Sequence, residues 1–193
     1  MKTDCAVLIT AAGLSGRMGV SKALLKWNEE MNFLQKIIAA YSDFGCSEII
    51  ITLNEETFEY FNSLSMSSVL FVLNPYPELE RMFSIQLGMK SIKKSTFCFI
   101  QTVDNPFVEI DLLEKIYQCK SKDKYVTPTY QEKSGHPILI NNRIINHICQ
   151  MNIEKKHLKE VLNQFPRKLV EVENPEIFYN INTMEDYQKL IAC

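Results

Sequence analysis

A loop rich in small and cationic residues follows the first apolar run of the sequence, Cys5-Ala-Val-Leu-Ile-Thr10. It continues as Ala11-Ala-Gly-Leu-Ser-Gly-Arg-Met-Gly-Val-Ser-Lys22. Small residues let the backbone approach a ligand closely, successive N–H groups can form an anion-binding nest, and Arg17 and Lys22 add two positive charges. These features suit a polyphosphate. A solvated turn with two surface cations is the simpler alternative, and the position directly after a predicted strand favours the ligand site.

Two common phosphate-binding patterns do not fit this loop. Met18 stands where the second glycine of the pattern G-x-x-x-x-G-K would be, and Ser15 breaks the pattern G-x-G-x-x-G. The loop therefore argues against P-loop kinases and against dinucleotide-dependent dehydrogenases.

A single carboxylate follows another apolar run. Asp104 comes directly after the strand predicted at Thr96–Val103, and Pro106 fixes the exit of the chain. A hard cation suits this carboxylate, because Mg²⁺ in a nucleotide site needs only one or two protein ligands besides phosphate oxygens. The alternative is that Asp104 only caps the helix that follows. The residue pattern alone does not decide between these two roles.

Strand patterns and helix patterns alternate along the whole sequence. The strands are expected at Cys5–Thr10, Glu48–Leu53, Val69–Leu73, Thr96–Val103, Lys124–Thr127, Pro137–Ile140 and Lys168–Val172. The helices are expected at Phe33–Phe44, Glu55–Asn62, Ser84–Ile92, Ile110–Cys119, Arg143–Met151, His157–Phe165 and Met184–Ile191, the last with Thr183 as its N-cap.

This alternation predicts an α/β fold that is Rossmann-like, with three layers α/β/α around a mostly parallel, mixed sheet. The stretch Tyr125–Ile140 is expected to form a lid or flap beside the sheet. Ligands of such sheets bind beyond the carboxyl ends of the strands. We therefore expect the site in the loops that follow Thr10, Leu73 and Val103.

The composition limits the class of protein. The chain has 193 residues, 46% of them hydrophobic and 23% charged, which predicts one globular domain over residues 1–193. The net charge is −2, so no overall positive field favours nucleic acid or an anionic membrane as partner. The six cysteines stand singly and are expected to be reduced thiols. With no signal-peptide pattern and no membrane-length apolar run, the expected location is the cytoplasm.

The first loop resembles a known signature. Thr10-Ala-Ala-Gly-x-Ser-x-Arg-Met-Gly-x-x-Lys22, followed by Ala-Leu-Leu, is similar to that of the MobA-like nucleotidyltransferases, in particular the molybdenum cofactor cytidylyltransferases. The resemblance implies that Thr10, Ala11, Ala12, Gly13 and Ser15 contact a nucleoside triphosphate. It also implies that Arg17 and Lys22 are catalytic and neutralise phosphate charge, and that the nucleotide is CTP, because the guanylyl branch has Leu-Ala-Gly-Gly instead.

Two further segments match the same family. The resemblance makes Asp104 the magnesium ligand and a catalytic residue, since family members carry Asp-x-Pro there. Asn180-Ile-Asn182-Thr-Met-Glu-Asp186 resembles the closing motif of the family, with asparagines in place of two aspartates. The carbonyl of Asn182 remains a second candidate ligand for Mg²⁺. Thr183 and Asp186 form a helix-capping arrangement that has a purely structural explanation.

Two other segments match less closely. Ser84 takes the place of a nucleotide-contacting serine in the family's Gly-Met-x-x-Ser segment, but a gap-free alignment puts Arg81 where the family has Met. An N-cap role for Ser84 is an equal alternative. Ser134-Gly-His136-Pro resembles the Gly-His-Pro segment on the acceptor side of the cleft, where His136 would orient a phosphate. A turn before a strand, with a hydrogen-bonded histidine, also explains that segment.

The resemblance implies transfer of CMP from CTP to a phosphorylated acceptor, with Mg²⁺ as cofactor and pyrophosphate as product. Molybdopterin that carries molybdenum is the expected acceptor, and a molybdenum hydroxylase would be the partner that receives the product. Two alternatives stay open from the residues: a cytidylyltransferase for a small sugar, polyol or choline phosphate, and a nucleotide-binding module without catalysis. Arg81 and the neutral Asn182 favour the module, whereas Arg17, Lys22 and Asp104 argue for the enzyme.

Overall fold

A computed structural model describes residues 3–14, 16, 18–64, 66–153 and 156–191. Within these residues, eight strands form one sheet in the order β3-β2-β1-β4-β7-β5-β6, with β8 paired to β5. The strands are β1 (Cys5–Ala11), β2 (Glu48–Leu53), β3 (Val69–Leu73), β4 (Phe97–Thr102), β5 (Tyr125–Tyr130), β6 (Lys133–Ser134), β7 (Ile138–Asn141) and β8 (Arg167–Glu171). Strands β3, β2, β1 and β4 run parallel, and β7 runs antiparallel to β4.

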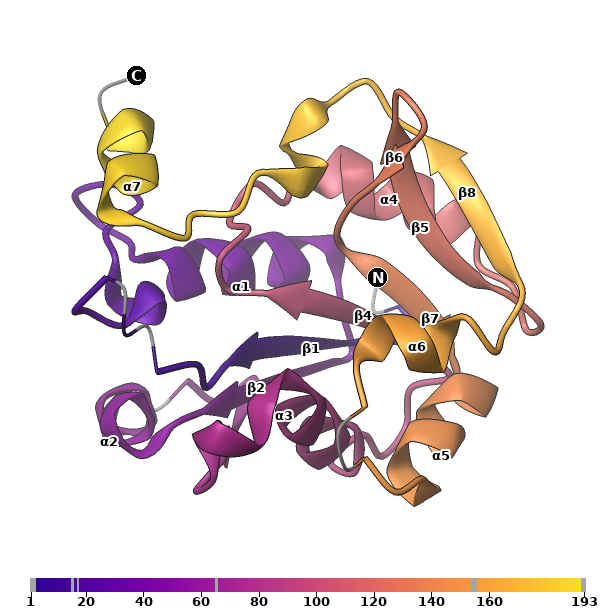
Figure 1. Cartoon of the computed structure of the whole chain (residues 1–193), viewed down its shortest axis with the longest axis horizontal. Coiled ribbons are helices and arrows are strands. Elements are labelled where there is room, and N and C mark those ends of the chain that lie inside the picture. The colour runs from indigo at the N-terminus through magenta and orange to yellow at the C-terminus, as the bar shows by residue number, and fades with distance from the viewer. Residues whose placement is uncertain (1–2, 15, 17, 65, 154–155, 192–193) are drawn as a thin grey trace.

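Helices cover both faces of the sheet (Figure 1). They are α1 (Phe33–Phe44), α2 (Glu55–Ser63), α3 (Glu80–Met89), α4 (Ile110–Gln118), α5 (Asn142–Gln150), α6 (Leu158–Leu162) and α7 (Met184–Ile191), with short 3₁₀ helices η1 (Lys22–Leu24), η2 (Pro77–Leu79) and η3 (Pro175–Phe178). Helices α1 and α4 pack together on one face, and α3 and α5 pack together on the other. The predicted Rossmann-like, mostly parallel mixed sheet is confirmed.

Strand β1 shows why the sheet needs two helical layers. All seven of its residues are buried. Val7 and Ile9 belong to the core beneath α1, while Ala6 and Leu8 belong to the core beneath α3 and α5. A strand buried on both faces has a continuous apolar sequence rather than an alternating one. The carboxyl-terminal end of β1, around Thr10, is therefore held rigidly between two cores.

Several predicted elements match the structure residue for residue, among them α1, β2, β3 and α7. Two expectations are wrong. The helix expected from Ser84 begins at Glu80. The stretch Tyr125–Ile140 is no lid, because it supplies β5, β6 and β7 of the sheet. The strand expected at Lys124–Thr127 is longer in the structure, because β5 continues through Pro128, whose carbonyl accepts a hydrogen bond from the Gly135 N–H at 2.9 Å.

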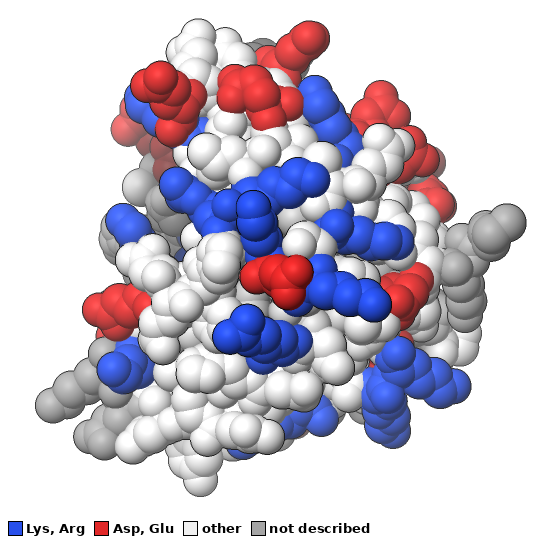
Figure 2. Space-filling model, turned by 90° about the vertical axis from the view of Figure 1, so that its right-hand side faces the viewer, with Lys and Arg blue, Asp and Glu red and all other residues white. Residues whose placement is uncertain are grey.

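The surface charge is uneven. Figure 2 shows Lys and Arg gathered on the side of the molecule where the amino ends of β1 and β4 lie. Exposed cations stand in the loops at this edge, before β4, before β5 and at the start of β8: Lys93, Lys94, Lys122, Lys124, Arg167 and Lys168. A net charge of −2 gave no sign of this local gathering. Among the described residues, no helix is long and apolar enough to cross a membrane.

Candidate active site

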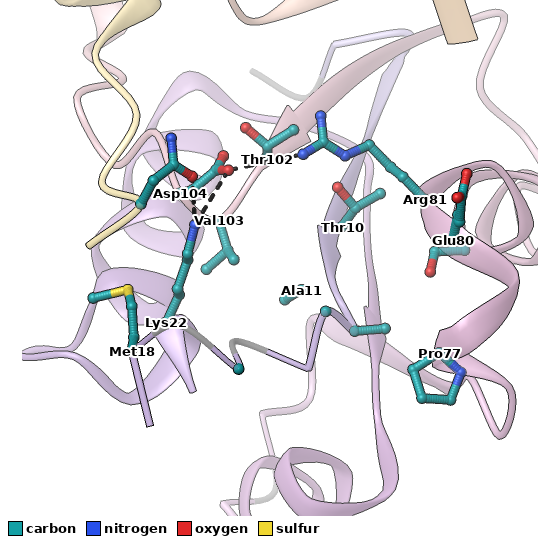
Figure 3. Close-up of a pocket in the computed structure, with 15 residues that line it drawn as sticks. Thr10, Ala11, Met18, Lys22, Pro77, Glu80, Arg81, Thr102, Val103 and Asp104 are labelled. Carbon is teal, nitrogen blue, oxygen red and sulfur yellow. Dashed lines mark hydrogen bonds and ion pairs between the residues drawn. The ribbon is translucent and has the colours of Figure 1, made fainter. Parts of the chain in front are cut away.

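A pocket of about 310 Å³ lies at the carboxyl ends of the parallel strands. Figure 3 shows it between the end of β1, the end of β4 and the start of α3. The loops after Thr10, Leu73 and Val103 all contribute to it, as expected. The residues that line it are Thr10, Ala11, Ala12, Gly13, Gly16, Met18, Lys22, Pro77, Glu80, Arg81, Ser84, Thr102, Val103, Asp104 and Asn182.

The first loop forms one wall of the pocket with its backbone. The backbone carbonyl of Gly13 accepts a hydrogen bond from Asn54 Nδ2 at 3.5 Å. Asn54 follows β2 and also caps α2 by accepting from the Thr57 N–H, so the loop is tied to a fixed helix end. Two predicted site residues of this loop, Ser15 and Arg17, lie outside the residues that the structure describes.

Asp104 is held in place by its own backbone and its neighbours. The Ile181 N–H donates to the Asp104 carbonyl at 2.8 Å. Buried Gln101 donates from Nε2 to the carbonyls of Thr102 and Asn105, which shapes the turn around Asp104. Helix α4 begins at Ile110, six positions after Asp104. The capping role is thereby excluded, and the carboxylate is left for a role in the pocket.

Two cations approach the Asp104 carboxylate from opposite walls. Lys22 Nζ lies 3.6 Å from Asp104 Oδ2 and donates to Asn182 Oδ1 at 2.8 Å. Arg81 Nη2 lies 3.8 Å from the same Asp104 oxygen (Figure 3). The hydrogen bond between Ile181 and Asp104 explains how Asn182, distant in sequence, comes to this place. The structure thus brings Lys22, Asp104 and Asn182 together.

The oxygens of Asp104 and Asn182 fit a hard cation. Both already converge on one positive group, the Lys22 ammonium. Asp104 Oδ1 is buried and has no hydrogen-bond partner among the described residues, and such an atom is costly unless a ligand satisfies it. Within the described part of the chain, no three His, Cys, Asp or Glu side chains form a metal cage. One carboxylate and one amide oxygen suit Mg²⁺ that takes its other ligands from phosphate and water.

Ser84 lines the pocket but is not an N-cap. It lies inside α3 and its hydroxyl accepts a hydrogen bond from Asn74 Nδ2 at 2.9 Å. The chain enters α3 through Glu80, whose φ of 64° is typical of glycine. In the gap-free alignment Glu80 takes the place of the family's glycine, so the backbone agrees with that register. Arg81 is then the residue that turns into the pocket.

His136 lies beside the pocket rather than in its lining. Its backbone N–H donates to the Ile177 carbonyl at 2.7 Å, and its Nδ1 atom is buried without a partner among the described residues. Burial lowers the pKa of His136, and the nearby Arg81 guanidinium lowers it further, although Asp104 acts in the opposite direction. The lowered pKa favours the neutral form of His136, which lies on the side of Asp104 where β7 begins.

Sequence reasoning missed three polar residues that build the site. Asn54 and Asn74 each follow a parallel strand directly, and Gln101 is buried near the end of β4. Their shared signal is an amide side chain at the carboxyl end of an apolar run, the edge at which ligands bind. Arg81 departs from the family pattern, but its approach to Asp104 has no signal in the sequence.

Comparisons with known proteins show the family of this chain. A family model described as the MobA-like NTP transferase domain matches residues 7–171. The molybdenum cofactor cytidylyltransferase of Escherichia coli strain K12 is 31% identical over 189 residues, which cover 95% of this chain and 93% of that protein. A probable molybdenum cofactor guanylyltransferase of Clostridium perfringens strain 13 is 28% identical over 204 residues, covering 99% of this chain and 97% of that protein.

A solved structure shares the fold. The molybdopterin-guanine dinucleotide biosynthesis protein A of Archaeoglobus fulgidus superposes with a TM-score of 0.70 at 15% identity, over 96% of each chain. The family match spans most of the chain, and the E. coli relative is similar over nearly its full length. The chain accordingly belongs to the MobA-like NTP transferase family, as a nucleotidyltransferase whose relatives include molybdenum cofactor cytidylyl- and guanylyltransferases.

Proposed function

We propose that this chain transfers CMP from CTP to a phosphate group of molybdenum-bearing molybdopterin and releases pyrophosphate. The observation that carries the proposal is the meeting of Lys22, Asp104 and Asn182 beside the backbone of the first loop. The choice of CTP is supported by the sequence Thr10-Ala-Ala-Gly13, which resembles the cytidylyl branch. It is also supported by the cytidylyltransferase of E. coli among the relatives.

The proposed roles follow from the positions of the side chains. The backbone from Ala11 to Gly13 seats the nucleotide, and Ser84 contacts it from the opposite wall. Lys22 offsets the charge of the triphosphate, and Arg17 is assigned the same role from the sequence alone. Such transfers depend mainly on positioning and charge neutralisation, so a rigid, pre-ordered pocket supplies most of the rate enhancement.

Mg²⁺ is the proposed cofactor, with Asp104 and Asn182 as the protein atoms that would hold it. When bound, it would neutralise phosphate charge and stabilise the leaving pyrophosphate. The unpartnered Asp104 Oδ1 and the converging Asn182 Oδ1 support this assignment. An uncharged second ligand makes the site depend on substrate oxygens, so we expect tight metal binding only when the nucleotide is present.

GTP is the second candidate nucleotide. A probable molybdenum cofactor guanylyltransferase of C. perfringens is 28% identical over 99% of this chain, and the Asn-x-Asn pattern that ends at Asn182 resembles the guanylyl branch of the family. The choice between CTP and GTP does not follow from the residues that would contact the base. Both nucleotides therefore belong in the test.

The test is pyrophosphate release with Mg²⁺ and CTP, GTP, ATP or UTP, each against the molybdenum-bearing pterin and against sugar, polyol and choline phosphates. Release with CTP and the pterin alone supports the proposal. Release with GTP instead of CTP replaces the nucleotide in the proposal. Release only with a small phosphate ester replaces the acceptor. Binding of CTP without release in any combination overturns the enzymatic role and supports a binding module.

A further inference from the structure

Arg81 places a second cation on the Asp104 carboxylate, on the side away from Lys22. Its Nη2 atom lies 3.8 Å from Asp104 Oδ2, the same oxygen that is 3.6 Å from Lys22 Nζ. In Figure 3, Arg81 reaches from α3 past Thr102, and Lys22 comes from the opposite side. The Arg81 side chain is 55% exposed whereas that of Lys22 is 16% exposed. Arg81 is therefore accessible to a ligand that enters from outside.

Unsatisfied polar atoms gather at the same place. Among the described residues, four side-chain atoms are buried without a hydrogen-bond partner: Thr102 Oγ1, Asp104 Oδ1 and His136 Nδ1 around the end of β4, and Thr52 Oγ1 in β2. Buried polar atoms in folded proteins are nearly always paired, so each exception needs an explanation. A cation would satisfy Asp104 Oδ1, as proposed above, and a ligand oxygen that accepts hydrogen bonds from the Thr102 hydroxyl and the His136 imidazole would satisfy the other two atoms.

The direction of β7 brings His136 to this group. Strand β7 runs antiparallel to β4, and the last pair of the ladder joins Ile100 to Ile138. The ladder stops at Ile138, and His136 lies two residues before it. The charges of Arg81 and Asp104 act on the His136 imidazole, so the segment that leads into β7 lies at the same edge of the pocket as Asp104, and Arg81 reaches toward this edge from α3.

The charges of the pocket divide into two halves around Asp104. On one side, Lys22 stands next to the small residues of the first loop, where a triphosphate is expected. On the other side, Arg81 reaches past Thr102, and its charge acts on the His136 imidazole. If the Asp104 carboxylate bound a metal ion, the charges of Lys22 and Arg81 would no longer be neutralised by it and could bind anionic substrate groups. The planar guanidinium of Arg81 suits two oxygens of one phosphate.

We propose that Arg81 is the residue that binds the phosphate of the acceptor, in a subsite formed with Thr102 and His136, while Lys22 serves the nucleotide. The inference rests on the proposed nucleotidyl transfer. It names the acceptor by class: a phosphomonoester, bound as its dianion. One acceptor oxygen bonds to the α-phosphorus of the nucleotide, the bond from that phosphorus to the bridging oxygen breaks, and pyrophosphate leaves with the electron pair. No proton transfer is needed, because the attacking oxygen is already ionised.

The experiment compares Arg81→Met and Arg81→Lys with Arg143→Met. Arg143 is exposed in the first turn of α5, which follows the end of β7 at the opposite edge of the sheet, and it serves as the matched control. The first measurement is the KM for CTP and for the acceptor in the pyrophosphate assay. The second is calorimetric titration of inorganic phosphate into each protein saturated with Mg²⁺ and the α,β-methylene analogue of CTP.

We expect Arg81→Met to raise the KM for the acceptor and to weaken phosphate binding, each about 10- to 100-fold, because a charge-assisted hydrogen bond is lost. The KM for CTP stays within about twofold of the parent value. Arg81→Lys restores phosphate binding only in part, because lysine lacks the two parallel N–H donors of a guanidinium. Arg143→Met behaves as the parent protein.

Two results overturn the inference. In one, Arg81→Met raises the KM for CTP and leaves the acceptor unaffected, which would assign Arg81 to the nucleotide. In the other, Arg81→Met matches Arg143→Met in both measurements. If the parent protein itself releases no pyrophosphate with any pair of substrates, the proposed function fails, and the phosphate titration still decides whether Arg81 binds a phosphate group.

Discussion

Replacing Asp104 by Asn separates catalysis from folding in this protein. The Asp104 side chain is only 13% exposed and is held between Lys22 and Arg81. The substitution keeps the shape of the side chain and removes its charge. We expect Asp104→Asn to lose nearly all metal-dependent turnover and to change the free energy of unfolding very little.

The expected change in stability is small because two large effects oppose each other. At 3.6 and 3.8 Å, each ion pair attracts by about 4 kcal/mol at an effective dielectric constant of about 20. Burial of the carboxylate, with Oδ1 unpartnered among the described residues, costs several kcal/mol in the opposite direction. A net change within about 1 kcal/mol shifts the melting temperature by no more than about 4 °C for a chain of this size.

The expected change in turnover is much larger. Loss of one preorganised electrostatic group in an active site typically costs about 10²- to 10³-fold in kcat. Turnover is measured as pyrophosphate release over a range of Mg²⁺ concentrations. Binding of Mn²⁺ in the presence of CTP, followed by electron paramagnetic resonance, gives a second readout that does not require turnover.

Asp111→Asn is the matched control, because Asp111 is exposed in the first turn of α4. It should keep turnover within about twofold and lose at most about 1 kcal/mol from the helix dipole. The reasoning is refuted if Asp104→Asn loses stability in proportion to activity, which would make Asp104 structural. It is equally refuted if the variant binds Mn²⁺ as the parent protein does.

Three further substitutions test the framework that carries the site. Burial raises the pKa of Glu48, but hydrogen bonds from Ser95 and neighbouring backbone N–H groups lower it overall, so the folded protein favours the charged carboxylate. Glu48→Gln removes that charge and should destabilise the fold by about 1–2 kcal/mol at pH 7. As the folded-state pKa is depressed, thermal melts at stepped pH should show this difference shrinking below the ordinary pKa of a glutamate, about 4.3, and disappearing only below the folded-state pKa. Gly88→Ala would drive its Cβ into Leu8 Cδ1 in the core, so chemical unfolding should show a loss of about 1–3 kcal/mol. Part of this loss should be recovered when Leu8 is also shortened, and simple additivity of the two changes would contradict the packing argument. Glu80→Gly should raise the melting temperature by about 2–6 °C, because Glu80 holds a φ of 64°, and a lower melting temperature would show that the backbone there is unstrained.

The parts of the site that follow directly from strand ends were predictable from the sequence. Asp104 and the first loop each come after an apolar run, and a parallel sheet brings such ends to one edge. Asn182 could be assigned only through the family resemblance, because its place depends on the hydrogen bond from Ile181 to the Asp104 backbone. Contacts between residues so far apart in sequence have no local signal.

The errors come from positions where a residue departs from its usual preference. Pro128 lies within β5, although proline usually ends a strand or lies at an edge, and the strand expected here ends before it, at Thr127. Glu80 begins α3 with a backbone conformation that favours glycine. Starting the helix at Ser84 instead left Arg81 outside it, and its approach to Asp104 could not be foreseen.

The mixed direction of the sheet has a consequence for the proposed chemistry. Strands β1 and β4 both end at the pocket, so the first loop and Asp104 come from the parallel half. Strand β7 begins there because it runs antiparallel, and the segment that leads into it is anchored through the His136 N–H to the Ile177 carbonyl rather than by a helix. Asp104 therefore stands at the boundary between the two halves.

A reaction that joins two anions needs a positive charge beside each of them, and the two cations that share Asp104 Oδ2 come from the two sides of this boundary. The carboxylate keeps them in place before either substrate arrives, which is why its loss should affect both substrates while loss of Lys22 or Arg81 affects one.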